Sequence, residues 1–317
     1  MELTTTQTQQ LSAHRAELFS VLDSFAGQQD VKPTSREFYR RAVGRFFEWV
    51  QATGREISRL TVTDVIAYKE NLLSAGKSTL TVGGYINALR RFYDWAESNR
   101  ISVNITKGVH APKRRQEFFK QPLSVAKVGE LLHHERTTQS PRDFAIINLM
   151  ARTGLRCVEV CRANVGDITF VGADNTRVLL VQGKGRDAKD NYVVLTDAAY
   201  LPIRDYLLTR RANANEPLFT SESNHTANGG RLSTRAVSGI AKRGLIAVGL
   251  DNHAFTAHSL RHTAGTNILR AGGTLEQAQQ TLRHANPATT QIYARMALSE
   301  RRLTNGGEFL LDNLYNV

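Results

Sequence analysis

Residues that can attack and stabilise a phosphate ester are concentrated in the last third of the chain. His258-Ser259-Leu260-Arg261-His262 is followed by Leu282-Arg283-His284 and then by Thr289-Thr290-Gln291-Ile292-Tyr293. Attack on a phosphodiester needs a nucleophile, positive charge on the nonbridging oxygens and an acid for the leaving group. These segments contain a tyrosine, arginines and histidines, which can fill those roles. We therefore expect phosphoryl-transfer chemistry with Tyr293 as the nucleophile.

An arginine and a lysine upstream extend this set. Thr153-Gly154-Leu155-Arg156 has Glu159 three residues after the arginine, and Gly183-Lys184-Gly185 falls between two predicted strands. Arg156 and Arg261 can clamp one phosphate through planar guanidinium groups, a geometry that lysine cannot reproduce. Glu159 follows Arg156 by about one helical turn, where it can brace the arginine. Since phenoxide is also a stable leaving group, a phosphotyrosine bond formed here would be reversible.

Taken together, these segments resemble the signature of the tyrosine recombinase, or phage integrase, family. That signature has a His-x-x-Arg, a Leu-Gly-His and a Thr-Thr-x-x-Tyr nucleophile, preceded by an arginine motif and a hairpin lysine. Order, spacing and structural context match over essentially the whole chain. The resemblance implies site-specific DNA recombination through a 3′-phosphotyrosine, without a cofactor or metal. The sequence departs from the pattern at Arg283, where glycine is usual, and at Ala163-Asn164, where leucine is commoner.

The resemblance also implies roles for individual residues. The implied catalytic set is Arg156, Lys184, His258, Arg261, His284 and Tyr293. Glu159 is implied to brace the side chains of this set without contacting the DNA. Lys184 is implied as the general acid for the leaving 5′ oxygen, and its flanking glycines permit it to move. Lys189, on the same turn, is the alternative. His258 is implied as an acid/base partner and His284 as a phosphate ligand.

Other motifs favour structural interpretations. His258 and His262 are spaced like a zinc-binding pair, but they lack the intervening glutamate of zinc hydrolases and a cysteine cluster, so we expect no metal. Cys157 and Cys161 lie four apart in one helical pattern and are expected to be reduced core thiols. Tyr315 has no catalytic context and is expected in the core.

The charge of the chain favours a polyanionic partner. Forty-one lysines and arginines against 29 acidic residues give a net charge of +12 and a pI near 9.9. Double-stranded DNA fits, because neutralising its phosphates releases counterions. No window approaches the roughly 18 apolar residues that a membrane span requires, and the N-terminus lacks the features of a secretory signal. We therefore expect a soluble, cytoplasmic protein with no membrane partner.

Helical periodicity dominates the first hundred residues. Apolar stripes with capping signals predict helices over about 14–29, 34–53, 61–76 and 78–98. They predict an all-helical domain over residues 14–104 after a flexible tail at 1–13, and the resemblance implies that this domain binds the DNA core site. Residues 105–122 contain Gly, Pro and the basic run Lys113, Arg114 and Arg115. We expect a linker that either follows the DNA backbone or is simply solvated.

The remaining residues, 123–317, predict a catalytic domain of mixed structure. Three short strands at 168–170, 177–181 and 192–195 predict a small antiparallel sheet. Helices are predicted over about 124–134, 141–153, from near 156, 198–211, 233–248, 259–271, 274–282 and 287–298. The predicted fold class is therefore mainly α with a small antiparallel β-sheet, an α+β fold.

An apolar tail follows the polar hinge Asn305-Gly306-Gly307. Such a tail can pack on its own domain or on a neighbour. The resemblance implies a homo-tetramer on two DNA sites that exchanges C-terminal segments, so alignment of Tyr293 would depend on a neighbouring subunit. It also allows accessory DNA-bending or directionality proteins as partners.

Two rival functions stay open at the level of sequence. A type IB topoisomerase uses similar residues as a monomer, and a DNA-binding protein could have lost catalysis. A mobile-element integrase and a resolvase of chromosome or plasmid dimers are not distinguished. The target sequence is not readable, because it is recognised by contacts to base edges and by DNA deformation.

Overall fold

The structure, a computed structural model, describes residues 17–113, 121–183, 186–222 and 230–315. The predicted tail at 1–13 lies outside these ranges, as do Arg114 and Arg115 of the predicted basic linker, whereas Lys113 is described and exposed. The chain divides into two compact units, residues 1–117 and 118–317, and each packs around its own apolar core.

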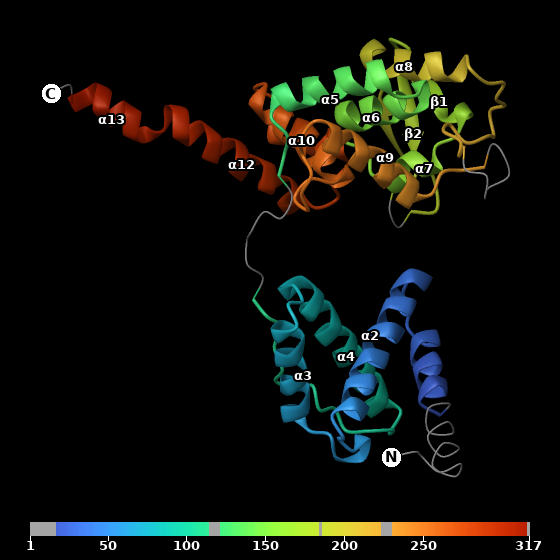
Figure 1. The fold of residues 1–317 in the computed structure, drawn as a ribbon, viewed down its shortest axis with the longest axis vertical. Coiled ribbons are helices and arrows are strands. Elements are labelled where there is room, and N and C mark those ends of the chain that lie inside the picture. Colours follow the sequence, from blue (N-terminus) through green and yellow to red (C-terminus); the bar gives the residue numbers. More distant parts are fainter. Residues whose placement is uncertain (1–16, 114–120, 184–185, 223–229, 316–317) are drawn as a thin grey trace. The chain divides into compact units, whose positions relative to one another are not determined.

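Unit 1 is a helical bundle, with no strand among its described residues (Figure 1). A helix covering residues 17–27 precedes α2 (Pro33–Ala52), the 3-10 turn η1 (Ile57–Arg59), α3 (Val62–Ser74) and α4 (Thr79–Ser98). The starts of the helices follow from local chemistry. Thr61 and Asp64 form a capping box on α3, and the Ser78 hydroxyl accepts from the backbone N–H of Thr81 at the start of α4.

A cluster of aromatic rings lies within the aliphatic core of unit 1. The rings of Phe46 and Tyr68 meet edge-on at 5.1 Å, and those of Phe47 and Phe92 at 5.6 Å. Edge-to-face pairs contribute about 0.5–1.5 kcal/mol each beyond the burial of their area. These rings come from α2, α3 and α4, and their helical spacing turns them toward the core.

Unit 2 combines helices with one small sheet. Its elements are α5 (Val125–Thr138), α6 (Pro141–Thr153), α7 (Cys157–Arg162), the 3-10 turn η2 (Val165–Asp167), β1 (Ile168–Val171), β2 (Thr176–Val181), β3 (Asn191–Val194), α8 (Asp197–Leu207), α9 (Thr234–Ala247), α10 (Ala257–Arg270), α11 (Leu275–Leu282), α12 (Pro287–Asn305) and α13 (Gly307–Tyr315). The strands pair antiparallel in the order β1-β2-β3, with Leu179 opposite Ile168 and Val193. The predicted fold class, mainly α with a small antiparallel sheet, is confirmed.

Two helices of unit 2 differ most from their predicted extents. The helix predicted from near Arg156 to about residue 167 ends already at Arg162, because Asn164 pairs with Pro217 in an isolated bridge and Val165 to Asp167 form a separate turn. The helix predicted to end at residue 298 continues to Asn305. Its first turn is set by Pro287 at an N-terminal position and by the Asn286 side chain, which accepts from the backbone N–H of Ala288.

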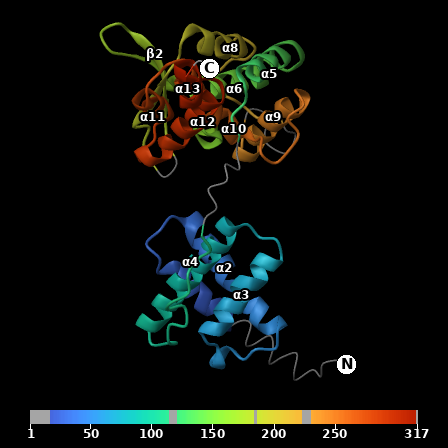
Figure 2. The same ribbon diagram turned by 90° about the vertical axis from the view of Figure 1, so that its left-hand side faces the viewer.

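The end of the chain runs outward from the body of unit 2. Figure 1 shows α12 and α13 extending away from the other helices, and the same segment faces the viewer in Figure 2. Large apolar side chains on α13 are exposed, namely Phe309, Leu311, Leu314 and Tyr315. The expectation that Tyr315 lies in the core is therefore wrong, because its helix makes little contact with the body of the unit.

Candidate active site

The site begins at the sharp turn between α6 and α7. Gly154 ends α6 in the left-handed region, with φ of 61°, and a Cβ there would lie 2.4 Å from Leu282 Cδ2. Only glycine fits both the backbone conformation and the contact. The turn places Arg156 at the N-cap of α7.

Glu159 holds Arg156 in place. The Arg156 backbone N–H donates to Glu159 Oε2, and Arg156 Nη1 donates to Oε1, both at 2.8 Å. The carboxylate is 1% exposed. Burial acts to raise its pKa, but Arg283, the Arg156 backbone N–H and the Arg156 and Arg261 charges together hold the pKa below its usual value. The predicted bracing of Arg156 by Glu159 is what these contacts provide.

Arg261 lies in α10 and is almost completely buried, with 1% of the residue exposed. Its Nη1 donates to the carbonyl oxygen of Gly154 at 2.7 Å, and its Nη2 donates to the carbonyl oxygen of Leu282. Burial and the neighbouring Arg156 charge lower its pKa to about 10, so the guanidinium stays protonated at neutral pH. Arg261 thus joins α10 to the turn before Arg156 and to the end of α11.

Tyr293 enters this cluster from α12 and is 2% exposed. It packs on Gly265 of α10, where a Cβ would lie 2.9 Å from Tyr293 Cδ2. Burial raises the pKa of its hydroxyl, while the charges of Arg261 and Arg156 act to lower it. The charges of both arginines therefore act on the Tyr293 hydroxyl.

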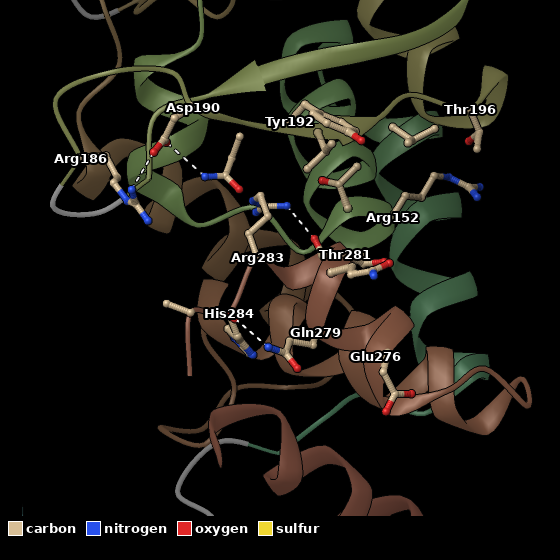
Figure 3. Close-up of a pocket in the computed structure, with 16 residues that line it drawn as sticks. Arg152, Arg186, Asp190, Tyr192, Thr196, Glu276, Gln279, Thr281, Arg283 and His284 are labelled. Atoms are coloured by element: carbon tan, nitrogen blue, oxygen red, sulfur yellow. Dashed lines mark hydrogen bonds and ion pairs between the residues drawn. The ribbon is translucent and has the colours of Figure 1, made fainter. Parts of the chain in front are cut away.

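His284 stacks on Tyr293. Its ring lies 5.9 Å from that of Tyr293, at 15° to it, and its Nδ1 lies 2.9 Å from Thr290 Oγ1. Gln279 Nε2 donates to the His284 carbonyl oxygen at 3.2 Å, as Figure 3 shows. Burial, followed by the charges of Arg261, Arg156 and Arg283, lowers the pKa of His284 to about 4. The imidazole is consequently neutral at physiological pH and contacts its surroundings as a hydrogen-bonding group.

His258 is exposed on the first turn of α10 and does not stack on Tyr293 directly. Its ring meets the ring of His262 edge-on at 4.8 Å, and the His262 ring meets that of Tyr293 at 5.3 Å. A row of three rings therefore joins exposed His258 to the buried tyrosine. From sequence, His262 is expected only as half of a possible zinc-binding pair, although its spacing of four from His258 places both on one helix face.

The hairpin between β2 and β3 forms the other side of the site. Lys184 lies outside the described residues, but Gly183 lines a cavity of about 270 Å³ together with Arg156, Glu159 and Arg283. Lys189 contacts a different group, since its Nζ lies 2.6 and 2.5 Å from the two carboxylate oxygens of Asp167. This ion pair occupies the Lys189 ammonium, which argues against Lys189 as the general acid.

A larger cavity of about 920 Å³ opens beside the site, between β3 and α11 (Figure 3). Arg152, Arg186 and Arg283 give it a basic lining, partly balanced by Asp190 and Glu276. Within the described ranges, no three His, Cys, Asp or Glu side chains gather as a metal-binding group would. None of the described helices combines the length and apolarity that crossing a bilayer requires.

Comparisons with protein families agree with both units. Residues 122–300 match the phage integrase family, and residues 22–100 match the N-terminal SAM-like domain of phage integrases.

Individual relatives are recombinases. Tyrosine recombinase XerC of Corynebacterium glutamicum is 30% identical, over 72% of this chain and 71% of the relative. XerC of Alcanivorax borkumensis is 31% identical, over 75% of this chain and 76% of the relative. Tyrosine recombinase XerD of Oceanobacillus iheyensis is 28% identical, over 81% of this chain and 86% of the relative.

Solved structures share the fold. The XerH site-specific recombinase in a post-cleavage complex with a palindromic difH substrate has a TM-score of 0.69 at 18% identity, over 85% of this chain and 78% of that one. The Tn1549 transposon integrase in complex with transposon right-end DNA has a TM-score of 0.67 at 16% identity, over 91% of this chain and 99% of that one.

Proposed function

Since the chain belongs to the phage integrase family of tyrosine recombinases, and is a site-specific recombinase that cleaves and rejoins DNA, we propose that Tyr293 is its nucleophile. The observation that carries this assignment is the convergence of four side chains on one place from distant segments. They are Arg156, Arg261, His284 and Tyr293, and each is linked to another by a contact or by the effect of its charge.

In the proposed reaction the Tyr293 hydroxyl oxygen attacks the scissile phosphorus, and the bond from phosphorus to the 5′ oxygen breaks. The products are a 3′-phosphotyrosine and a free 5′ hydroxyl. The phenolic proton passes to a base, and the exposed imidazole of His258 is the proposed acceptor, from which it can be lost to water. Because the phosphotyrosine is itself an ester, a second 5′ hydroxyl can displace it without ATP.

The two arginines stabilise charge on the phosphate. Arg156 and Arg261 are fixed before DNA arrives, the first by Glu159 and the second by two backbone carbonyls. Preorganised cations cost no rearrangement when charge develops in the transition state. Neutral His284 supports them with a hydrogen bond to a phosphate oxygen, and it places no further positive charge beside the guanidinium groups.

Lys184 is proposed as the acid that protonates the leaving 5′ oxygen. It lies outside the described residues, but the preceding Gly183 lines the same cavity as Arg156. The engagement of Lys189 with Asp167 supports assigning the role to Lys184.

Double-stranded DNA is the substrate, and the finer assignments are proposals. We assign phosphate contacts to the basic run Lys113, Arg114 and Arg115, and we place the activity in the cytoplasm. We also propose that four copies act on two DNA sites, and that the exposed apolar residues of α13 contact a neighbouring copy. The DNA joined can belong to a mobile element or to a replicon dimer, and accessory DNA-bending or directionality proteins are compatible with either.

Covalent capture tests the assignment of Tyr293. The protein is incubated with a pool of DNA duplexes of randomised sequence and is then denatured. DNA that stays attached to the denatured protein is recovered and sequenced. We expect enrichment of one site with the wild type and none with Tyr293→Phe. Tyr200→Phe is the control, because Tyr200 lies in α8. The substitution removes a hydroxyl but keeps the aromatic ring, on which the Arg177 guanidinium stacks at 3.9 Å from the ring centroid. An adduct formed by Tyr293→Phe would refute the assignment.

A further inference from the structure

Arg283 has a backbone conformation that ordinarily belongs to glycine. It ends α11 in the left-handed region, with φ of 55° and ψ of 49°. A residue with a side chain is strained there. Its only counterparts among the described non-glycine residues are Arg100 and Asn175. A strained position is retained where contacts of the side chain compensate for it.

The contacts of Arg283 lead directly to the site. Its side chain is 7% exposed, its Nη1 donates to the Thr281 carbonyl oxygen at 2.6 Å, and its Nη2 donates to Glu159 Oε2 at 2.9 Å. The first contact folds the side chain back along α11, and the second reaches across to α7. Figure 3 shows Arg283 with its bond to Thr281, between the hairpin residues and His284.

Glu159 is thus shared by two guanidinium groups. Arg156 occupies Oε1 through its side chain and Oε2 through its backbone N–H, and Arg283 occupies Oε2 from the other side. Charge-assisted bonds of this kind are short and directional. With both oxygens engaged, the carboxylate has little freedom to rotate, and so the direction in which it holds Arg156 is set as well.

We propose that Arg283 is a positioning residue, which fixes the Glu159 carboxylate and through it the phosphate-binding guanidinium of Arg156. The inference rests on the proposed function, in which Arg156 binds the scissile phosphate. Because His284 follows Arg283 directly in the chain, the same ion pair ties the His284 segment to the Arg156 segment. Arg156 and His284, the two proposed phosphate ligands, are therefore held at fixed positions relative to each other although they lie far apart in the sequence.

A role in holding α11 against α7 does not by itself explain this side chain. The buried Nε of Arg283 has no hydrogen-bond partner among the described residues. Buried polar groups are nearly always paired in a fold. Arg283 also lines the 270 Å³ cavity together with Arg156 and Glu159. The Arg283 cation therefore lies in the wall of this cavity, and the packing leaves one of its donors unpaired.

The test compares two arginine-to-glycine variants with the same backbone conformation. Arg283→Gly relieves the strained backbone and removes the ion pair, while Arg100→Gly relieves an equivalent strain, with φ of 56°, at an exposed position in unit 1. The substrate is the duplex sequence recovered by covalent capture, with a nick near the cleavage position. After cleavage the short fragment that carries the 5′ hydroxyl dissociates, so the strand cannot be rejoined and the covalent adduct accumulates. We measure the single-turnover rate of adduct formation and, separately, the dissociation constant for intact duplex.

We expect Arg283→Gly to form the adduct roughly 10-fold more slowly, the size expected when one charge-assisted hydrogen bond is lost from a transition-state network. The dissociation constant should stay within about twofold of the wild type, since one positioning contact adds little to phosphate binding as a whole. Arg100→Gly should match the wild type in the rate of adduct formation, measured with protein in excess of its dissociation constant. Arg283→Lys should form the adduct faster than Arg283→Gly but more slowly than the wild type, because lysine keeps the positive charge and lacks the planar guanidinium that donates two hydrogen bonds.

A double-mutant cycle with Glu159→Gln separates positioning from a merely structural role. If Arg283 acts through Glu159, then Arg283→Gly should change the rate by less than about twofold in the Glu159→Gln background. An equal slowing in both backgrounds, or a wild-type rate for Arg283→Gly, would overturn the inference.

If Arg283→Gly melts before the assay temperature, the cycle is run with Arg283→Lys and judged by the same outcomes. Failure of the wild type to form any adduct would instead refute the proposed function.

Discussion

Arg261 and Gly154, separated by 107 positions in the sequence, are joined by a hydrogen bond of 2.7 Å from the buried guanidinium to the glycine carbonyl. This bond places Arg261 directly beside the turn that presents Arg156, the other arginine proposed to bind phosphate. The two cations are held at a common place against their mutual repulsion by backbone carbonyls and by Glu159. The proposed phosphate site is therefore preassembled in the folded protein.

Arg261→Lys tests this preassembly. A lysine cannot donate to two diverging carbonyls while presenting a planar face to phosphate. We expect adduct formation to fall by about 100-fold or more, and the free energy of unfolding to fall by about 1–3 kcal/mol. Arg204→Lys is the matched control, because Arg204 is half-exposed and its ion pair within the described part of the chain is with the adjacent Asp205. Activity retained by Arg261→Lys would show that charge alone suffices.

Gly265→Ala tests the close packing of the nucleophile. The added methyl would lie 2.8 Å from Leu282 Cδ1 and 2.9 Å from Tyr293 Cδ2, so the tyrosine ring must move. We expect a loss of about 1–3 kcal/mol in stability and slower adduct formation. In Gly239→Ala, also within a helix, the nearest atom is the flexible Arg243 Nη1 at 3.9 Å, and the substitution should stabilise by up to about 1 kcal/mol. Normal cleavage by Gly265→Ala would contradict the packing argument.

His284 should make the protein less stable as the pH falls. Its folded pKa of about 4 lies below its unfolded value of about 6.5, so the unfolded state binds more protons between those values and stability rises with pH there. The wild type should therefore lose stability from pH 7 to pH 4, and His284→Asn should lose less over that range. Urea denaturation followed by far-UV circular dichroism measures this. Parallel pH dependences for the two proteins would disprove the shift.

Glu135 should change the stability of the protein with pH in the opposite direction. Burial, followed by the Asp143 charge, raises the pKa of this carboxyl to about 7 against the partial opposition of Arg243. The folded state then binds more protons than the unfolded state between about pH 4.5 and 7, so stability falls as the pH rises. Glu135→Gln should stabilise unit 2 by on the order of 1–3 kcal/mol at pH 8 and by little at pH 5.

The control for Glu135 is Glu130→Gln on the same helix, where the exposed carboxylate pairs with Lys127. Far-UV circular dichroism is the suitable probe, because both tryptophans, Trp49 and Trp95, lie in unit 1 and do not report on unit 2. A stabilisation by Glu135→Gln that does not change with pH would exclude titration as its cause.

The exposed apolar residues of α13 predict a split between cleavage and recombination. Leu314→Asp places a charge on an exposed side chain far along the projecting helix. Adduct formation at a single nicked site should persist, while recombination between two sites on a plasmid should fall. Deleting residues 306–317 should have the stronger effect. Normal recombination by both variants would show that the tail packs only within its own subunit.

The sequence predicted the elements well wherever one local cause decides them. The capping box of Thr61 and Asp64 and the glycine at the end of α6 place helix ends that the structure reproduces. Apolar periodicity likewise predicted the core of unit 1 and the three paired strands.

Tertiary contacts explain what sequence patterns missed. The early end of α7 depends on pairing between Asn164 and Pro217, which lie far apart in the chain. The contact of His262 with Tyr293 depends on how α10 crosses α12, and the ion pair of Arg283 with Glu159 depends on a left-handed backbone that the residue type disfavours. No local pattern encodes these distances.

Mass spectrometry of the trapped adduct tests the central claim most directly. Digestion with trypsin should release residues 284–295 as one peptide, in which Tyr293 is the only tyrosine. After nuclease treatment of the captured complex, we predict that this peptide carries a 3′-phosphorylated nucleotide remnant on Tyr293. A remnant on any other residue, or an adduct that leaves this peptide unmodified, would contradict the account.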